Sequence, residues 1–499
     1  MTETPAKPVR LQSTFIRGAA WGMAMRWGIK LLGLISTVIL ARIISPEDYG
    51  IVAMAMLFAG MAEVLVDFGA QINILRKQTL DRDFIDSAWS LQIIQGGFVA
   101  TLLALSAPLA GVYFNEPRVV WVIWVIAACL LFDGLTNIGI TLARKNFEFK
   151  LEFRYRIVGK LIGVVATIIA ALFLRDYRAL VAGLALGHVS NVFLSYFMHP
   201  YRPRWNTAKI RSMWGFSKWL LISGVGTFAA RKADQMIAGR MGSAHELGIY
   251  NMGSEIGLMP TSELGPPIMR AFLPTLSTIK HDMPRVQAAV LKTLGAINTL
   301  TIAAAFGFVA VAEPLTLVLL GEKWIRVAPF LAIFAVVGAL RVAVSPFSSL
   351  LLLIGHSRLH ARMIWIELLV FVMLAAWLAP RFGVIGLAYA RLGSTLIYFL
   401  TNLYTISTSA DIGFSRIGMA LWRPLMSAGL MFAALSALPT HMMNIYLDLA
   451  FRVAIGVLVY VSALWLSWKS CGQPDGIESL VLARLRLSVH NLPCGSLRK

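Results

Sequence analysis

Long apolar runs recur along the whole chain, and they limit what it can fold into more than any other feature. Each run is close to the roughly 20 residues that a helix needs to cross a hydrocarbon core about 30 Å thick. No polar stretch between the runs is longer than a connecting loop. Backbone groups must be hydrogen-bonded within lipid, which helices achieve internally. The sequence therefore predicts an all-α, polytopic membrane protein without a separate soluble domain.

The composition agrees with this interpretation. Hydrophobic residues make up 58% of the 499 residues and charged residues only 14%, whereas soluble domains are roughly 45–50% apolar. We predict about fourteen transmembrane helices, near 17–43, 50–74, 86–112, 119–142, 156–174, 179–199, 214–240, 249–273, 288–312, 327–354, 363–379, 384–405, 423–440 and 447–468.

Basic residues indicate the orientation of the chain. Lysine and arginine gather in alternating loops, at 76–82, 144–156 and 202–218, and such loops are typically cytoplasmic. Both termini are basic as well, so we predict that both are cytoplasmic. The net charge of +20 is then mainly a topology signal, with a smaller part available for anionic lipid headgroups of the bilayer. It gives no reason to expect nucleic-acid binding.

One short stretch occurs twice. "ILARIISPEDYGIVAM", Ile39–Met54, aligns without gaps with "IAGRMGSAHELGIYNM", Ile237–Met252. The identical positions include Arg42 and Arg240, Ser45 and Ser243, Gly50 and Gly248, and Met54 and Met252. We expect each copy to be an external hairpin that joins two spans.

The hairpin chemistry is that of helix ends. Ser45 and Ser243 are suited to N-cap the second helix, with Asp48 or Glu246 three residues later as in a capping box. Pro46 suits the first helical turn. A structural role therefore explains this motif better than ligand binding does.

The position of the two copies predicts the domain organisation. They follow the first and the seventh span, so an even number of spans separates them and both have the same orientation. This indicates two six-helix lobes in parallel repeat, related by a pseudo-two-fold axis along the membrane normal. The predicted parts are an N-terminal lobe at 1–205, a C-terminal lobe at 206–410, two extra transmembrane helices at 411–470 and a basic cytoplasmic tail at 471–499.

Several spans carry ionisable residues, which are costly at membrane depth and are candidates for function. Some of them keep helical spacing and so share one face: Gly22, Arg26 and Lys30 in the first span, and Glu63 and Asp67 in the second. Single polar positions such as Asp133 and His188 occur in other spans. The cationic candidates are Arg26, Lys30, Arg231, Arg341 and Arg391. The candidates for ion coupling are Glu63, Asp67, Asp234 and Glu255.

The chain lacks the motifs of several enzyme classes. It has no G-x-x-x-x-G-K-[ST] phosphate loop, no H-E-x-x-H and no paired cysteine ligands. No long external loop supplies carboxylates or histidines for catalysis. We therefore expect a transporter with a charged interior rather than an enzyme, and no metal or cofactor.

The residues also resemble a known family. The stretch Arg17–Ala70, with "LAR", "PEDYG" and "DFG", closely resembles the opening of Wzx-type polysaccharide exporters, and the basic loop "ARKNFEFKLEFRYRI" at Ala143–Ile157 is similar too. These exporters belong to the multidrug/oligosaccharidyl-lipid/polysaccharide superfamily. The resemblance covers residues 15–440 and is closest to the colanic acid and succinoglycan branch.

The resemblance implies a flippase in the bacterial inner membrane. Its substrate would be an undecaprenyl-diphosphate-linked oligosaccharide, moved by alternating access for exopolysaccharide, capsule or lipopolysaccharide O-antigen synthesis. A polysaccharide polymerase and a chain-length regulator would be partners. In this interpretation the five cationic candidates receive the diphosphate.

Three alternatives stay open. The interior cations could instead neutralise Glu63, Asp67 and Asp234 as ion pairs. The chain could be an ion-coupled multidrug or cation antiporter of the same superfamily, although such a cavity would be dominated by acidic and aromatic groups. A membrane polysaccharide polymerase or ligase is disfavoured by the short external loops.

Overall fold

A computed structural model describes residues 8–66, 73–75, 77, 79–211, 213, 228, 231–439 and 444–472. Within these residues every regular element is a helix, which confirms the predicted all-α class. The chain divides into two compact units, Met1–Gly248 and Ile249–Lys499, and each is described by itself.

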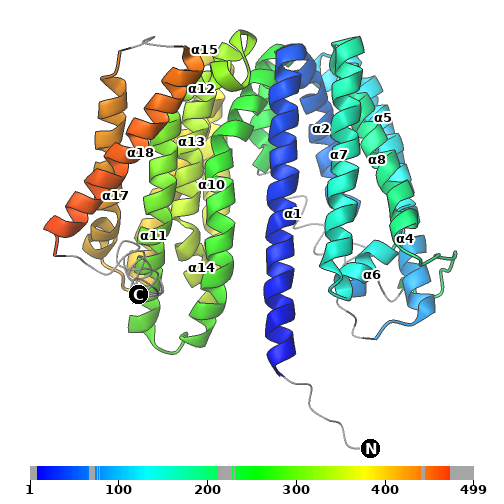
Figure 1. The fold of residues 1–499 in the computed structure, drawn as a ribbon, viewed down its shortest axis with the longest axis horizontal. Coiled ribbons are helices and arrows are strands. Elements are labelled where there is room, and N and C mark those ends of the chain that lie inside the picture. Colours follow the sequence, from blue (N-terminus) through cyan, green and yellow to red (C-terminus); the bar gives the residue numbers. More distant parts are fainter. Residues whose placement is uncertain are drawn as a thin grey trace, which may run out of the picture. The chain divides into compact units, whose positions relative to one another are not determined.

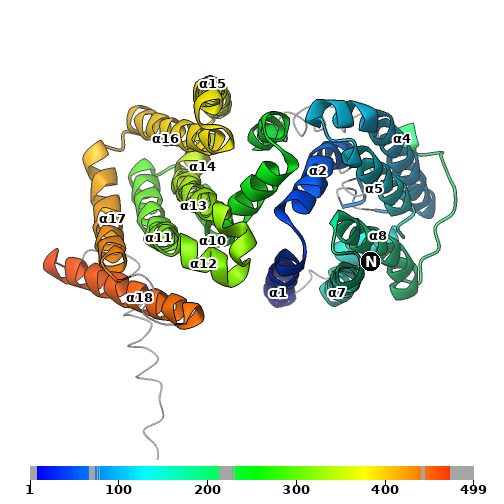
Figure 2. The ribbon, with the colours of Figure 1, turned by 90° about the horizontal axis from the view of Figure 1, so that it is seen from above.

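The first unit is a bundle of long helices with one short one (Figure 1). Helix α7 packs on α1 and α8, and α5 packs on α4 and α8. Seen from above, these helices surround the interior of the unit (Figure 2). The bounds are α1 (Pro8–Ile43), α2 (Pro46–Val66), α4 (Arg82–Phe114), α5 (Arg118–Gly134), α6 (Gly139–Lys145), α7 (Phe149–Leu174) and α8 (Tyr177–Met198).

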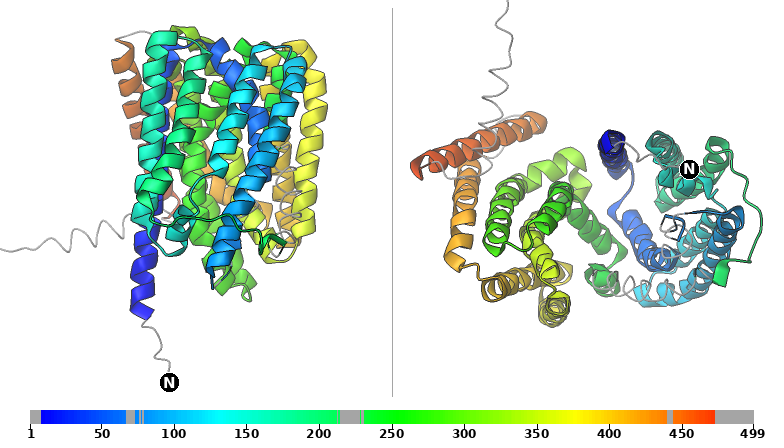
Figure 3. Two further views of the ribbon diagram at one scale, coloured as in Figure 1. Left: turned by 90° about the vertical axis from the view of Figure 1, so that its right-hand side faces the viewer. Right: turned by 90° about the horizontal axis from the view of Figure 1, so that it is seen from below.

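The second unit has its own core, in which apolar side chains such as Leu276, Leu294, Phe347 and Ile406 are fully buried. Helix α17 lies at its edge between α11 and α18 (Figure 3). The bounds are α10 (Ala244–Thr278), which begins before the boundary of the units, then α11 (Met283–Ala310), α12 (Ala312–Leu319), η1 (Glu322–Val327), α13 (Ala328–Ala343), α14 (Ser345–Leu353), α15 (Ser357–Phe382), α16 (Val384–Ser409), α17 (Phe414–Ser436) and α18 (Ile445–Ser470).

Ten of the described helices are long and apolar enough to cross a membrane, and a bent helix pair gives up to eleven. The predicted count of fourteen is therefore not confirmed. Helices α2 and α10 form at the second and eighth predicted spans but are not among the ten. Helix α10 carries Glu255 and Glu263, which lower its hydropathy. Helix α2 is strongly apolar, but its last four side chains, from Glu63 on, lie outside the described residues. The seventh predicted span lies largely outside the described residues.

The fourth predicted span, 119–142, is broken. Helix α5 ends at Gly134, and α6 continues after a bend of 63°. A helix end leaves carbonyl groups without partners. Here the side-chain amide of Gln92, from α4, donates at 3.1–3.3 Å to the carbonyl oxygens of Asp133, Gly134 and Thr136. The break is thus satisfied by a side chain that is distant in sequence, and it leaves Asp133 on the last turn of α5.

The duplicated hairpins have the predicted caps. The amide of Asp48 donates to Ser45 Oγ at 3.2 Å, and the amide of Glu246 donates to Ser243 Oγ at 3.3 Å. In the second copy the Ser243 amide also donates to Glu246 Oε2 at 3.0 Å, which completes a capping box. The first turns of α2 and α10 begin directly after these serines, so the predicted helix starts are confirmed.

The two hairpins also meet each other inside the first unit. A Cβ added at Gly50 would lie 1.7 Å from the carbonyl oxygen of Ala244, and one at Gly248 would lie 1.9 Å from that of Pro46. Ala244 is the repeat equivalent of Pro46, as Gly248 is of Gly50. The contact is therefore reciprocal, as a local pseudo-two-fold relation requires. The glycines are repeated because two backbones cross there.

The boundaries of the predicted lobes, extra helices and tail stay predictions.

Candidate functional site

Glycines set the spacing of α7 and α8. A Cβ at Gly163 would be 3.4 Å from the Cα of Gly187. One at Gly183 would be 1.7 Å from Thr167 Oγ1, and one at Gly159 would be 1.8 Å from Asn191 Oδ1. The two helices therefore pack closely at these glycines. Polar side chains next to them, such as Thr167 and Asn191, line a cavity.

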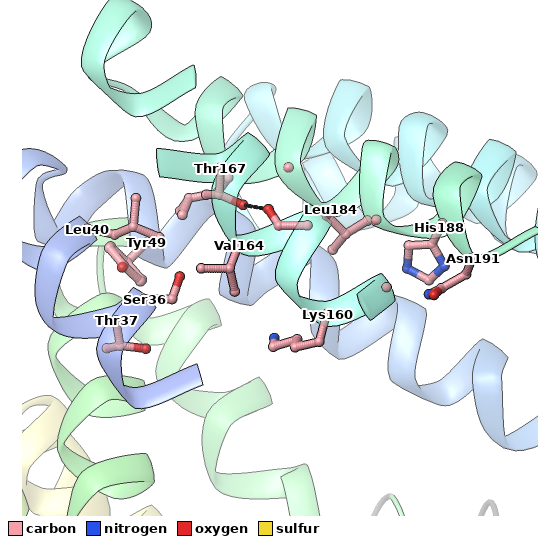
Figure 4. Close-up of a pocket in the computed structure, with 15 residues that line it drawn as sticks. Ser36, Thr37, Leu40, Tyr49, Lys160, Val164, Thr167, Leu184, His188 and Asn191 are labelled. Carbon is pink, nitrogen blue, oxygen red and sulfur yellow. Dashed lines mark hydrogen bonds between the residues drawn. The ribbon is translucent and has the colours of Figure 1, made fainter. Parts of the chain in front are cut away.

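The first cavity, of about 390 Å³, lies between α1, α2, α7 and α8. Ser36, Leu40 and Tyr49 lie at one end of it, and His188 and Asn191 lie at the other (Figure 4). The Lys160 side chain lies on the same wall as Val164 and Thr167, which α7 contributes.

Two further cavities continue from the first. One, of about 320 Å³, is lined by α4, α5, α6, α7 and α8 and shares His188 and Asn191 with the first. The other, of about 370 Å³, lies between α1, α6 and α7 and shares Arg144 and Arg156 with the second. Because neighbouring cavities share side chains, we treat the three as one feature, the first-unit hollow.

The hollow has a basic lining. Arg156 and Lys160 are exposed and lie one turn apart on α7. Arg144 Nη2 pairs with Glu152 Oε1 at 2.6 Å, and His188 Nδ1 lies 2.6 Å from Asp133 Oδ2. Three permanent cations therefore face two carboxylates and one histidine. An anionic group entering the hollow would meet a net positive lining.

The predicted cations of the first span, Arg26 and Lys30, are not among the side chains that line this hollow, although they lie on α1 beside residues that are. Gly22 and Thr37 both line it. Arg26 follows Gly22 by four residues and Lys30 precedes Thr37 by seven, so all four share one helix face. Arg26 and Lys30 are half-buried. The adjoining face is apolar and exposed, as expected against lipid: Met23, Trp27, Leu31 and Ile35.

Residues 231–241 are helical and carry two more of the predicted residues. Arg231 is exposed. Asp234 is 5% exposed, and its Oδ1 accepts from the Gln235 amide at 2.9 Å. Lys232 Nζ donates to Gln235 Oε1, also at 2.9 Å. Asp234, Lys232 and Gln235 are thus joined by hydrogen bonds within this stretch.

The other coupling candidates are less informative. The Glu63 side chain and the whole of Asp67 lie outside the described residues. Glu255 is exposed on α10, in the second unit.

The two predicted cations of the second unit have different surroundings. Arg341 Nη2 pairs with Glu367 Oε1 at 2.7 Å. This cation is therefore neutralised by an ion pair, as one alternative predicted, but its partner is none of the three acidic residues expected. Arg391 is 3% exposed, and its guanidinium lies 4.4 Å from the ring centroid of Phe371. The five predicted cations therefore divide into three in the first unit and two in the second.

Sequence reasoning missed Arg156 and Lys160 as lining residues and the pairing of His188 with Asp133. The fifth span was predicted to start at 156, so Arg156 was counted with the basic loop at the edge of the span, but α7 starts at Phe149. The four-residue spacing of Glu152, Arg156 and Lys160 was a usable signal for one face. The pairing had none, because 55 residues separate its members.

A bundle of membrane-spanning helices around a hollow with a basic lining is typical of a membrane transporter. The chain belongs to the polysaccharide biosynthesis protein family, whose model matches residues 39–329. It is a multi-pass protein of the bacterial cytoplasmic membrane.

Relatives are similar over most of their length. The chain is 22% identical over 422 residues to the lipopolysaccharide biosynthesis protein WzxC of Escherichia coli K12, covering 83% of this chain and 85% of the relative. It is 21% identical over 476 residues to the succinoglycan biosynthesis transport protein ExoT of Rhizobium meliloti, covering 92% and 94%. These relatives confirm the family resemblance seen in the sequence.

Solved structures share the fold. The lipid II flippase MurJ in an inward closed conformation matches with a TM-score of 0.69 at 14% identity, covering 91% of this chain and 99% of that one. An inward-facing multidrug resistance MATE family transporter matches with a TM-score of 0.51 at 14% identity, covering 76% and 95%. Both belong to the fold expected from the superfamily resemblance.

Proposed function

We propose that the chain is a flippase that moves undecaprenyl-diphosphate-linked oligosaccharide repeat units from the cytoplasmic to the periplasmic leaflet. The polymer made from them would be an exopolysaccharide, a capsule or an O-antigen. Family membership supports this, as do relatives named for lipopolysaccharide biosynthesis and succinoglycan transport. The structural neighbour named as a lipid II flippase also handles a lipid-linked substrate.

The observation that carries the proposal is the basic first-unit hollow inside a membrane-spanning bundle. A diphosphate cannot cross hydrocarbon unaided, because removing its charges from water costs too much. Arginine offers paired donors to phosphate oxygens, and lysine offers a mobile point charge. Arg156 and Lys160 on α7 line the hollow and provide both types, and Arg26 and Lys30 lie half-buried on α1, which also contributes to its wall. Sugars would occupy the same wet space while the polyprenyl tail stays in lipid.

The predicted cations contribute unequally in this proposal. Arg26 and Lys30 contact the diphosphate, and the exposed Arg231 assists them. Arg341 and Arg391 act less directly, because one is paired with Glu367 and the other is buried against Phe371. Glu63, Asp67, Asp234 and Glu255 remain proposed coupling residues.

Transport by alternating access follows from the repeat, since related lobes can expose one site to either side in turn. The chain needs no catalytic step of its own in this role. A polysaccharide polymerase and a chain-length regulator would act on the repeat units after they reach the periplasm. Both termini are proposed to be cytoplasmic.

Deletion of the gene tests the function directly. Repeat units should accumulate on undecaprenyl diphosphate and stay inaccessible to a membrane-impermeant glycan label in spheroplasts, while labelling in inverted vesicles rises. Expression of the wild-type chain in the deletion strain should restore export and is the control. Normal polymer export without the chain would refute the proposal, and increased drug sensitivity with normal polymer would favour the antiporter.

Single cysteines test the orientation. In a cysteine-free background, an impermeant thiol reagent should label positions Glu47, Asn115 and His245 in intact spheroplasts. It should label the exposed positions Asn146, Phe147 and Lys150, in the basic segment 145–156, only after permeabilisation. Labelling of these positions in intact spheroplasts would invert the proposed topology.

A further inference from the structure

His188 and Asp133 line the first-unit hollow, but none of the diphosphate contacts proposed above is assigned to them. His188 comes from α8 and Asp133 from the last turn of α5, and their Nδ1 and Oδ2 atoms lie 2.6 Å apart. The side chains are 30% and 35% exposed, so water within the hollow reaches both. The break after Gly134 and the Gln92 amide fix the end of α5, which holds the carboxylate toward α8.

The pair lies where two cavities meet. His188 and Asn191 line both of them. From there the first cavity runs along α7 and α8 toward Thr167 and Leu180, and it ends at Ser36 and Tyr49 (Figure 4). The second runs the opposite way, toward Thr141 and Arg144. A proton on the imidazole is therefore accessible from cavities that lead to opposite ends of α8.

The pair lies near the middle of the predicted membrane span, which agrees with its place between the two cavities. Helix α8 spans 22 residues, from Tyr177 to Met198, and His188 is close to its middle. At 1.5 Å per residue, roughly 16 Å of helix extends on either side. An ionisable pair at the middle of a span is costly unless it serves a purpose.

The two acidic groups of the hollow differ in their partners. Glu152 is paired with Arg144, and an arginine stays charged at all physiological pH values. Asp133 is paired with a histidine, whose charge changes near neutral pH. The titratable and charged groups that line a cavity together with the pair are Tyr49 of α2, Arg144 of α6, and Tyr155, Arg156 and Lys160 of α7.

We infer that His188 and Asp133 form a proton-binding site through which the first unit couples transport to the proton gradient. The imidazole takes one proton from water in one cavity, which forms one N–H bond and changes the net charge of the pair from −1 to 0. Release of that proton to water in the other cavity breaks the same bond and restores the charge. A proton suits this place better than a metal ion because, among the described residues, no third histidine, cysteine or carboxylate joins the pair as a ligand.

This charge change would act on the diphosphate. The pair then carries a different charge beside Arg156 and Lys160, so proton binding and anion binding influence each other reciprocally. The coupling rests on the proposed function, whereas proton binding at the pair does not.

The first experiment measures the proton without any substrate. The full-length protein, labelled with ¹⁵N at histidine side chains, is placed in lipid nanodiscs and titrated between about pH 5 and pH 9, the range around the ordinary histidine pKa. His188→Gln identifies the His188 signal. We expect a single-proton titration of that signal which changes in Asp133→Asn. A signal that keeps one protonation state over the whole range would overturn the inference.

The second experiment measures coupling in proteoliposomes with a labelled lipid-linked oligosaccharide. A one-unit pH gradient coupled to one proton supports up to about tenfold accumulation. We compare transport with and without the gradient as a ratio, so that a change in absolute rate does not enter. The ratio should fall to about 1 in both His188→Gln and Asp133→Asn.

His360→Gln is the matched control, because His360 is also half-buried but lies in the second unit; it should keep the wild-type ratio. A wild-type ratio in both pair variants would overturn the inference, as would the absence of any gradient effect in the wild type. Failure of the wild type to move the lipid at all would refute the proposed function instead, and the nanodisc titration would still decide the proton site.

Discussion

The two units place charge in different surroundings. In the first unit, Arg156, Lys160 and the His188–Asp133 pair line a hollow. In the second unit, Arg391 is 3% exposed against the Phe371 ring, and Arg452 is 7% exposed with Nε 2.8 Å from Asp448 Oδ2. The comparison teaches that an ionisable residue within a span is only a candidate for a role in transport. A residue that lines a cavity is available to a substrate or a proton, whereas a residue packed within protein contributes to stability.

The largest expected difference is in transport. Arg26→Gln with Lys30→Gln removes two charge-assisted contacts to the diphosphate, each worth about 1.5–3 kcal/mol, so we expect polymer export to fall about 100-fold or more. Arg341→Gln with Glu367→Gln removes a cation and its partner together, and export should fall by less than about tenfold. Polymer is measured per cell at matched membrane levels of the variants.

Equal loss of export in the two double variants would break the comparison between the units. Full export by a stable Arg26→Gln, Lys30→Gln protein would remove these residues from the substrate site.

The next difference concerns glycine. At Gly183, in the wall of the hollow, an added Cβ would lie 1.7 Å from Thr167 Oγ1 and 2.7 Å from Thr167 Cα. Gly183→Ala should therefore lower the free energy of unfolding by about 3 kcal/mol through overpacking. At Gly418, in α17 of the second unit, an added Cβ meets nothing within 4 Å, so Gly418→Ala should be neutral or stabilise by up to about 1 kcal/mol.

Thermal unfolding in detergent measures both glycine variants. A Gly183→Ala protein as stable as the wild type would show that α7 and α8 can separate without cost, contrary to the close packing that shapes the hollow.

A smaller effect on stability is expected at Gln92, which holds the end of α5 in place. Gln92→Leu leaves the carbonyl groups at the end of α5 without the Gln92 donor, at a cost of about 2 kcal/mol, typical of a buried group left unsatisfied. Asp133 would also lose its fixed position, so the variant should titrate at His188 differently from the wild type. Gln287, in the second unit, donates to a single carbonyl, that of Ala410, so Gln287→Leu is the control and should cost less. Equal losses would show that the break in α5 depends on other contacts.

The sequence predicted the helical class and the hairpin caps because their causes are local. Apolar length specifies a span, and a serine followed by an acidic residue three positions later specifies a helix start. The break after Gly134 depends on Gln92, about 40 residues earlier, and the proton site joins α5 to α8. No local pattern contains such pairings, since folding creates them. The start of α7 was missed for a different reason, because its first two turns are basic and resemble a cytoplasmic loop.

The smallest expected effect compares His188 with a second histidine of the same unit, His199, which follows the end of α8 outside the span. Burial lowers the pKa of His199, and Arg202 lowers it further, against an opposing contribution from the Glu148 carboxylate. Its Nδ1 accepts from the Tyr201 amide at 3.1 Å, which also favours the neutral ring.

A histidine whose pKa is lower in the folded state binds fewer protons than it does in the unfolded chain, so stability is present above the ordinary pKa and falls as the pH decreases below about 6.5. The wild type should therefore lose more thermal stability between pH 7.5 and pH 5.5 than His199→Gln does. The same variant should keep the full gradient dependence of transport, because His199 lies outside the hollow. Equal acid sensitivity of the two proteins would contradict the role given to burial at His199. Loss of gradient dependence in His199→Gln would instead end the distinction between a histidine that binds the transported proton and one that only stabilises the end of a helix.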